Sequence, residues 1–213
     1  MSTVPSDTLL AKLPLFPLRT VLFPGGLLPL KVFEARYQDM TRDCLRDHAP
    51  FGVCLLKSGS EVIQQDDPPV PESIGCLAEI VDCDVERFGL MHIRARGTRR
   101  FRLLSHRTEP NGLLRGQVQL LPEDRPLNGD ERVAKFGACA EVLERIVATL
   151  SERSPGNLPF IEPYAFDDPS WVSNRLAEVL PISARARQKL MEVLDAGARI
   201  DVVHHYMLQH QLL

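Results

Sequence analysis

The sequence lacks the features that mark secreted, membrane-spanning and zinc-binding proteins. It has no basic leader, because its first charged residue is Asp7, and it contains no Asn-x-Ser/Thr acceptor. The apolar stretch that follows Lys12 is interrupted by Pro14, Pro17, Arg19, Pro24 and Pro29, which a membrane-spanning helix would not tolerate. The 5 cysteines are odd in number and never spaced as CxxC. Reduced thiols, no metal site and a cytoplasmic location are therefore predicted.

The charge balance argues against general binding of nucleic acid. The net charge is −3, so the chain has no excess of Lys and Arg with which to neutralise phosphates. With 44% hydrophobic and 25% charged residues, the composition is that of an ordinary globular protein with a substantial core. General nucleic-acid binding is disfavoured, although residues 87–108 form a local basic cluster.

Up to about residue 122, short runs with a period of two dominate. In Leu90–Arg96, Met91, Ile93 and Ala95 face one way, and His92, Arg94 and Arg96 face the other, as a half-buried strand requires. Strands are predicted over 27–33, 51–57, 74–87, 90–97, 99–105 and 113–121, with one helix over 35–46. The segment QQDDPPVPES at 64–73 is predicted to be a loop.

After the polar stretch 122–129, the period becomes helical. Asp130 is a candidate N-cap, and the following apolar positions predict one buried helical face: Val133, Phe136, Ala140, Leu143, Val147 and Leu150. A proline-rich loop is predicted over 154–168, and further helices follow Asp168-Pro169 and Ser183, with a last one around Ile200–Leu208. The change of period predicts a β subdomain, residues 1–122, and a helical subdomain, residues 123–213.

Residues 13–37, LPLFPLRTVLFPGGLLPLKVFEARY, form the most informative motif. Phe23-Pro24-Gly25-Gly26 joins two apolar runs, with proline and glycine at the central positions that a type II turn favours. This stretch resembles the opening of the Lon N-terminal domain, the substrate-binding module in front of the Lon ATPase and peptidase. Two further stretches resemble the same family in the same order, IGCLAEI at 74–80 with RGTRRF at 96–101, and LAEVLPISARARQKLMEVLDAGARIDVV at 176–203.

The resemblance implies an α+β fold, a PUA-like, mostly antiparallel β-pseudobarrel followed by a C-terminal helical bundle. It also implies a module that lacks the ATPase and peptidase domains of Lon. None of the 13 glycines stands in the GxxxxGK[ST] pattern that cradles nucleotide phosphates, and no lysine has the serine context of the Lon peptidase. A stand-alone, non-enzymatic protein with no catalytic residues and no cofactor is expected.

Two other clusters of polar residues are candidates for metal sites. His204, His205 and His210 lack the spacing of three or four that places two ligands on one helical face. Asp82 and Asp84 share one face of a strand but have no third ligand nearby. We interpret both clusters as solvated surface, with Cys83 as a small core residue, so no metal site is predicted.

The resemblance implies that the chain recognises unfolded or extended polypeptide, either in an apolar groove or by adding a strand to a sheet edge. The candidate peptide-binding residues lie near the turn: Phe23, Phe33, Glu34, Arg36 and Tyr37. Of these, Phe23, Phe33 and Tyr37 are also candidates for the core, whereas Glu34 and Arg36 are expected at the surface. The client polypeptide and the oligomeric state are left open.

The alternative function is an RNA-binding PUA-like module that uses the basic strands at 94–102. Residues 87–108 contain seven arginines, two histidines and no acid. However, Phe101 and Leu103 are predicted to point inward rather than to stack on bases. The acids of the preceding strand, Glu79, Asp82, Asp84 and Glu86, lie where they would neutralise these arginines. Nucleic acid is therefore the less favoured partner.

Overall fold

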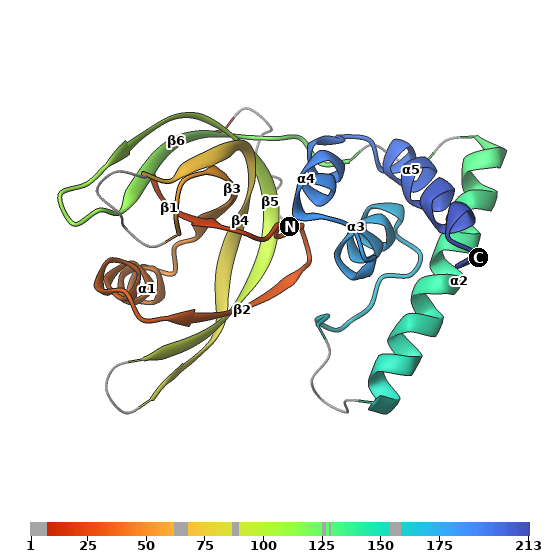
Figure 1. The fold of residues 1–213 in the computed structure, drawn as a ribbon, viewed down its shortest axis with the longest axis horizontal. Coiled ribbons are helices and arrows are strands. Elements are labelled where there is room, and N and C mark those ends of the chain that lie inside the picture. Colours follow the sequence, from red (N-terminus) through yellow and green to blue (C-terminus); the bar gives the residue numbers. More distant parts are fainter. Residues whose placement is uncertain (1–7, 62–67, 87–89, 125–126, 128, 154–158) are drawn as a thin grey trace. The chain divides into compact units, whose positions relative to one another are not determined.

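The computed structural model describes residues 8–61, 68–86, 90–124, 127, 129–153 and 159–213. Contacts divide the chain into two compact units, Met1–Pro122 and Glu123–Leu213. The first contains the strands and one helix, and the second contains the remaining described helices (Figure 1). Each unit is described by itself.

The first unit is a six-stranded sheet, counted over the described residues, in the order β2-β5-β4-β3-β1-β6. Its elements are β1 Leu9–Leu18, β2 Leu27–Val32, α1 Ala35–Asp47, β3 Phe51–Ser58, β4 Val70–Val85, β5 Met91–Thr108 and β6 Leu114–Leu120. Among the described strands, only β1 and β3 pair in parallel, and an additional β5–β6 pairing closes the sheet into a barrel (Figure 1). The predicted α+β class with a mostly antiparallel pseudobarrel is confirmed.

The barrel is filled by side chains from the inward face of each strand. One core cluster joins Leu15 of β1, Phe101 of β5 and Val118 of β6, each with 0% of its surface exposed. The alternation predicted for residues 91–96 is confirmed, since Met91, Ile93 and Ala95 are buried while Arg94 and Arg96 are exposed. The helix α1 buries Tyr37, Met40 and Cys44 on its predicted face.

Two strand predictions differ from the structure. Residues 91–108 form one continuous strand rather than two, because β4 pairs with residues 91–102 and β6 pairs with residues 101–108, while β2 covers residues 91–96 on the other side. The loop predicted over 64–73 is wrong for Val70–Ser73, which begin β4 and pair with β3 through an irregular register. Pro71, which has no N–H to donate, is accommodated at this irregularity. Residues 64–67 lie outside the described part.

The predicted turn at Phe23–Gly26 is confirmed. The Gly26 N–H donates to the Phe23 carbonyl over 3.0 Å, and Gly25 has a φ of +75°, which glycine adopts without strain. The turn packs directly on β5, where the Gly25 N–H donates to the Gly97 carbonyl (2.8 Å) and the Gly97 N–H donates to the Gly26 carbonyl (2.9 Å). A Cβ on Gly97 would lie 2.2 Å from the Phe23 oxygen, so only glycine permits this approach.

The second unit contains α2 Asp130–Arg153, α3 Pro169–Val179, α4 Ala184–Glu192 and α5 Ala196–Gln209. Asp168 and Ser183 cap α3 and α4 as predicted, since their side chains accept from the N–H groups of Ser170 and Ala186. Asp130 is the first residue of α2 rather than its N-cap. The predicted loop is outside the described part at 154–158, and residues 159–168 form turns and bends before α3.

The predicted buried face of α2 is only partly confirmed. Leu143 and Val147 are 0% and 6% exposed, and Phe136, Ala140 and Leu150 are half-buried. The prediction that Val133 is buried is wrong, because 53% of its surface is exposed.

Close to the start of the unit, Asp124 forms a buried ion pair with Arg199 of α5. The Arg199 Nη1 also donates to the Val193 carbonyl over 2.7 Å. This pair joins the start of the unit to its last helix.

Candidate functional site

The predicted binding region contains a small pocket where β2 runs into α1. Its volume is about 190 Å³, and it is lined by Phe16, Leu18, Leu30, Lys31, Val32, Phe33, Glu34, Tyr37 and Glu61. Three of the predicted site residues, Phe33, Glu34 and Tyr37, therefore share one pocket. The lining residues that the sequence interpretation missed come from β2 itself, from β1 and from the segment after β3, and no local pattern connects the last two segments to β2.

Tyr37 forms a rigid wall of the pocket. Its ring stacks on Phe16 with the ring centroids 3.8 Å apart and the planes 15° from parallel, and only 2% of the residue is exposed. The Arg36 guanidinium lies 4.4 Å from the centre of the same ring. Burial raises the pKa of Tyr37 to about 12, against a weaker lowering by Arg36, so the phenol stays neutral at physiological pH. The pocket wall is thus apolar and fixed in orientation.

The surface position expected for Arg36 is wrong, since the residue is only 4% exposed. Its Nη1 donates to the Gly112 carbonyl over 2.8 Å, and its Nη2 donates to the Glu61 carbonyl over 2.9 Å. Glu34, which is partly exposed, accepts from the Arg36 Nε over 3.1 Å. The guanidinium is buried because two loops supply carbonyl acceptors that replace water. Arg36 therefore holds together the segments next to the pocket and does not present its charge to a partner.

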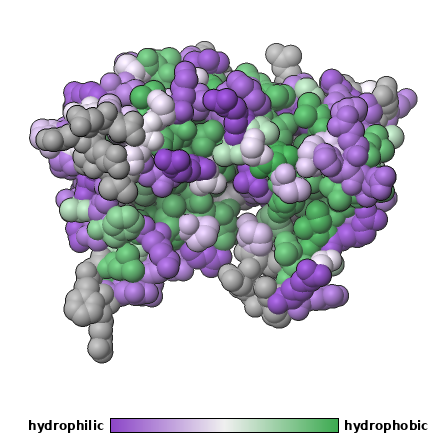
Figure 2. Space-filling view, viewed as in Figure 1, coloured by the Kyte–Doolittle hydropathy of each residue, from purple (hydrophilic) through white to green (hydrophobic). Residues whose placement is uncertain are grey.

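The two candidate phenylalanines have opposite environments. Phe23 is 0% exposed beneath the turn, so it belongs to the core and cannot contact a partner directly. Phe33 is 64% exposed at the pocket rim, the largest exposed fraction among the exposed large hydrophobic residues of the described chain. In the lower left of Figure 2, where β2 and the β4–β5 hairpin lie, hydrophobic residues reach the surface between hydrophilic ones.

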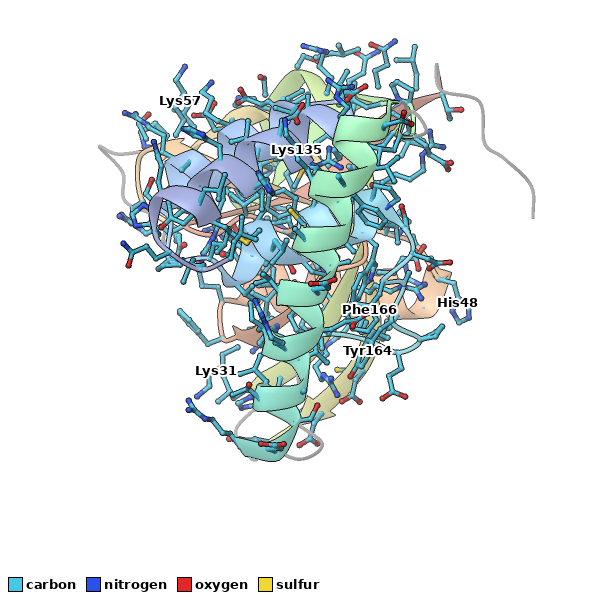
Figure 3. The ribbon with its side chains drawn as sticks, turned by 90° about the vertical axis from the view of Figure 1, so that its right-hand side faces the viewer. Lys31, His48, Lys57, Lys135, Tyr164 and Phe166 are labelled. Carbon is cyan, nitrogen blue, oxygen red and sulfur yellow. The ribbon has the colours of Figure 1, made fainter. Side chains whose placement is uncertain are left out.

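The strand β2 is an edge strand. Among the described strands it pairs only with β5, in the antiparallel register Leu27↔Arg96 to Val32↔Met91 (Figure 1). In an antiparallel pair, the N–H and C=O groups of every second residue point to the partner strand. Because the Gly26 carbonyl accepts from the Gly97 N–H, the backbone groups of Leu28, Leu30 and Val32 point toward β5. Those of Leu27, Pro29 and Lys31 point to the open edge, which suits Pro29 because it has no N–H to pair. Figure 3 shows the Lys31 side chain reaching outward.

The positive charge of the basic strand is partly compensated within the unit. Arg96 pairs with Glu79 over 3.0 Å, and Arg94 lies opposite Asp82 in the β4–β5 register. Arg100 is 6% exposed and Phe101 is 0% exposed, so neither is presented to a base. Leu103 is partly buried against the core cluster, as predicted. Residues 94–102 therefore form no stacking platform.

Other candidate chemistry finds no geometric support among the described residues. They contain no group of three or more His, Cys, Asp or Glu side chains that would hold a metal ion. Near the C-terminus, the rings of Tyr206 and His210 lie 4.2 Å apart, and His205 is exposed. Cys83 is half-buried rather than a core residue, while the other cysteines are buried thiols. No described helix has the length and apolarity that a membrane crossing needs.

The order of elements, a closed mixed sheet with one helix followed by helices, defines an α+β module of the kind found at the N-terminus of Lon proteases. The family model of the substrate-binding domain of ATP-dependent protease La (LON) matches residues 12–209. The chain belongs to this family.

A crystal structure of a Lon N-terminal domain protein from Xanthomonas campestris is 36% identical, with a TM-score of 0.69, and the match covers 91% of this chain and 97% of that one. The N-terminal domain of a Mycobacterium avium complex Lon protease shares the fold at 17% identity, with a TM-score of 0.63 over 93% and 99% of the two chains.

Among full-length proteins, the Lon protease of Anaeromyxobacter dehalogenans is 24% identical over 196 residues, which are 91% of this chain and 22% of that protein. The Lon protease of Paraburkholderia phytofirmans is 26% identical over 208 residues, 95% and 24% of the two chains. The chain thus spans about a quarter of the length of the curated relatives it matches. The family model describes a substrate-binding part and not a peptidase.

Proposed function

We propose that this chain is a non-catalytic, cytoplasmic module that binds extended polypeptide at the open edge of β2. The observation that carries the proposal is the position of this edge strand beside an apolar pocket with the exposed Phe33 at its rim. Membership of a substrate-binding family supports a polypeptide ligand. The neutralisation of Arg96 and the burial of Arg100 favour this ligand over RNA.

In the proposed mode, the peptide adds a strand to β2. The N–H groups of Leu27 and Lys31 donate to it, and the outward carbonyls of the same strand accept from it. One apolar side chain of the peptide enters the pocket against Tyr37, while another packs on Phe33. Pro29 offers no N–H, so the ladder is interrupted at its centre. Such a short ladder, opposed by the entropy of ordering the peptide, predicts a Kd on the order of micromolar or weaker.

The test is a fluorescence titration of labelled, permanently unfolded casein against three proteins. Phe33→Ser removes the exposed ring without touching the core and is expected to weaken binding several-fold. The matched control is Leu104→Ser, since Leu104 is also an exposed apolar strand residue, at 48%, but lies on β5 beyond the part that pairs with β2. Equal binding by all three proteins would move the site elsewhere. Failure of the wild type to bind would leave the peptide proposal without support.

A further inference from the structure

A second cavity, of about 320 Å³, lies where β1, β5 and β6 meet. It is lined by Ala11, Lys12, Ser105, His106, Arg107, Arg115, Gly116 and Gln117. It shares no residue with the pocket at β2. Three permanent cations and no carboxylate stand in this lining, and Ser105 and Gln117 add polar side chains. A cavity of this size accepts a small ligand, and its chemistry favours an anion.

Two of these cations oppose each other in the sheet. Arg107 of β5 and Arg115 of β6 are direct partners in the antiparallel register, an arrangement in which like charges destabilise the pair. Glu109 is shared between them, with its carboxylate 2.9 Å from the Arg107 guanidinium and 3.9 Å from that of Arg115. One carboxylate compensates only one of the two positive charges. The strand pair therefore holds an excess positive charge at the cavity wall.

The third cation, Lys12, lies at an irregularity of β1. The β1–β6 register moves from Leu10↔Val118 to Leu13↔Gly116, so β1 carries an extra residue here, as in a β-bulge. Lys12 has a φ of +63°, a left-handed conformation that costs free energy for any residue with a side chain. Its carbonyl accepts from the Arg115 Nη1 over 3.0 Å, which holds the bulge against the basic pair. Bulges and strained residues of this kind occur where a side chain is aimed at a ligand.

We propose that this cavity binds the phosphate group of a small anion. Lys12, Arg107 and Arg115 carry three positive charges and Glu109 one negative charge, so these side chains have an excess of positive charge that an anion would compensate. Guanidinium forks match phosphate oxygens in pairs, and the Ser105 hydroxyl and the Gln117 amide stand in the same lining as further donors. Asp43 and Asp47 line the adjacent cavity with Lys12 and Arg115, and the single Arg46 pairs with both, at 2.9 and 2.8 Å. Arg46 compensates one of their two negative charges, so the whole group of side chains still has an excess of positive charge.

The proposal is tested by NMR titration of the whole chain at constant ionic strength. Inorganic phosphate, pyrophosphate and AMP are added separately, and sodium chloride serves as the reference salt. Amide shifts are expected to concentrate at Lys12, at 105–107 and at 115–117. Lys12→Gln and Arg107→Gln are each expected to weaken phosphate binding on the order of tenfold, because each removes a charge-assisted contact. The matched control is Lys57→Gln, an exposed lysine outside this lining (Figure 3).

A second variant separates binding from folding. Lys12→Gly removes both the charge and the strained side chain, so it is expected to raise the thermal midpoint without phosphate while weakening phosphate binding. Tighter binding of AMP than of inorganic phosphate would identify a phosphate monoester as the ligand, and the reverse order would identify free phosphate. The proposal is overturned if none of the three anions shifts these amides, if Lys57→Gln weakens binding equally, or if only an RNA oligonucleotide binds.

Discussion

Arg36 is the single side chain on which the local structure of the β2 pocket most depends. Its guanidinium joins the start of α1 to the segment after β3 and to the loop before β6, through Glu34, Glu61 and Gly112. At 4% exposure these bonds are shielded from water, so losing the donor leaves buried acceptors unpaired. The position therefore combines a structural role with support for the proposed binding surface.

Arg36→Ala is expected to lower the free energy of unfolding by about 2–4 kcal/mol, since it leaves a carboxylate and two carbonyls without their partner. The measurement is equilibrium denaturation in urea. Arg42→Ala on the same helix is the matched control, because its side chain is 59% exposed and its ion pair with Asp39 lies at the surface. The control is expected to change stability by less than about 0.5 kcal/mol. Equal stability of the two variants would contradict the buried position of Arg36.

The same burial changes how the binding surface is tested. Exchanging the charges of Glu34 and Arg36 together would be a neutral surface change only if both side chains were exposed. Because Arg36 is buried, Arg36→Glu places a carboxylate among carbonyl acceptors and unfolds this corner of the unit. Phe33 is the better probe of binding, since 64% of its surface is exposed.

At the scale of elements, the unit depends on a close contact between the 23–26 turn and β5. The turn donates to and accepts from Gly97, and this contact leads the chain directly into β2. The hydrogen bonds of Gly25 and Gly26 in the turn with Gly97 in β5 thus fix the register of β2, the edge strand of the proposed site. A Cβ at Gly97 would separate the turn from β5.

Gly97→Ala is expected to destabilise the protein by about 2–3 kcal/mol, because its Cβ would lie 2.2 Å from the Phe23 oxygen and the turn must shift. Gly137→Ala within α2 is the matched control, since nothing lies within 4 Å of its Cβ position. There, alanine is expected to stabilise the helix by about 0.5–1 kcal/mol. Thermal and urea unfolding of both variants give the comparison, and a neutral Gly97→Ala would refute the close contact.

The helix α2 allows a second matched comparison. Val147→Asp buries an unpaired carboxylate and is expected to cost about 3 kcal/mol or more, since Val147 is 6% exposed. Val133→Asp makes the same chemical change where 53% of the residue is exposed, in the first turn of the helix, where an acid is favourable. Unfolding monitored by circular dichroism at 222 nm should separate the two. If Val147→Asp melts with the wild type, that face of α2 is not packed.

At the scale of the whole molecule, the family match runs through both units, from residue 12 to residue 209. The matched region of the Lon proteases is about a quarter of their length. The sequence contains neither a GxxxxGK[ST] phosphate loop nor the serine context of a Lon peptidase lysine. These two observations are the reason for proposing that the chain itself is non-catalytic.

The purified chain is therefore expected to hydrolyse neither ATP nor unfolded casein. Phosphate release and the cleavage of fluorescently labelled casein are the two measurements, each made before and after a second round of purification. Activity that disappears on repurification belongs to a contaminant. Cleavage that stays in constant proportion to the chain would contradict the non-catalytic assignment.

Local chemistry in the sequence was sufficient for most of the elements. The alternation at 91–96, the Pro-Gly turn and the caps Asp168 and Ser183 depend on neighbours within a few residues, and all of them are confirmed. The three stretches that resemble the Lon N-terminal domain likewise predicted the family and the fold class correctly. Periodicity and capping are short-range properties, so they can be read without knowing what packs against them.

Burial and the pocket were decided only by the tertiary structure. Arg36 is buried because the carbonyls of Glu61 and Gly112, 25 and 76 residues away in the chain, meet its guanidinium. Val133 remains exposed although its spacing matches that of Val147, because periodicity identifies a face but not how far a partner covers it. The pocket likewise takes Phe16, Phe33 and Glu61 from three segments, which only the closure of the sheet brings together.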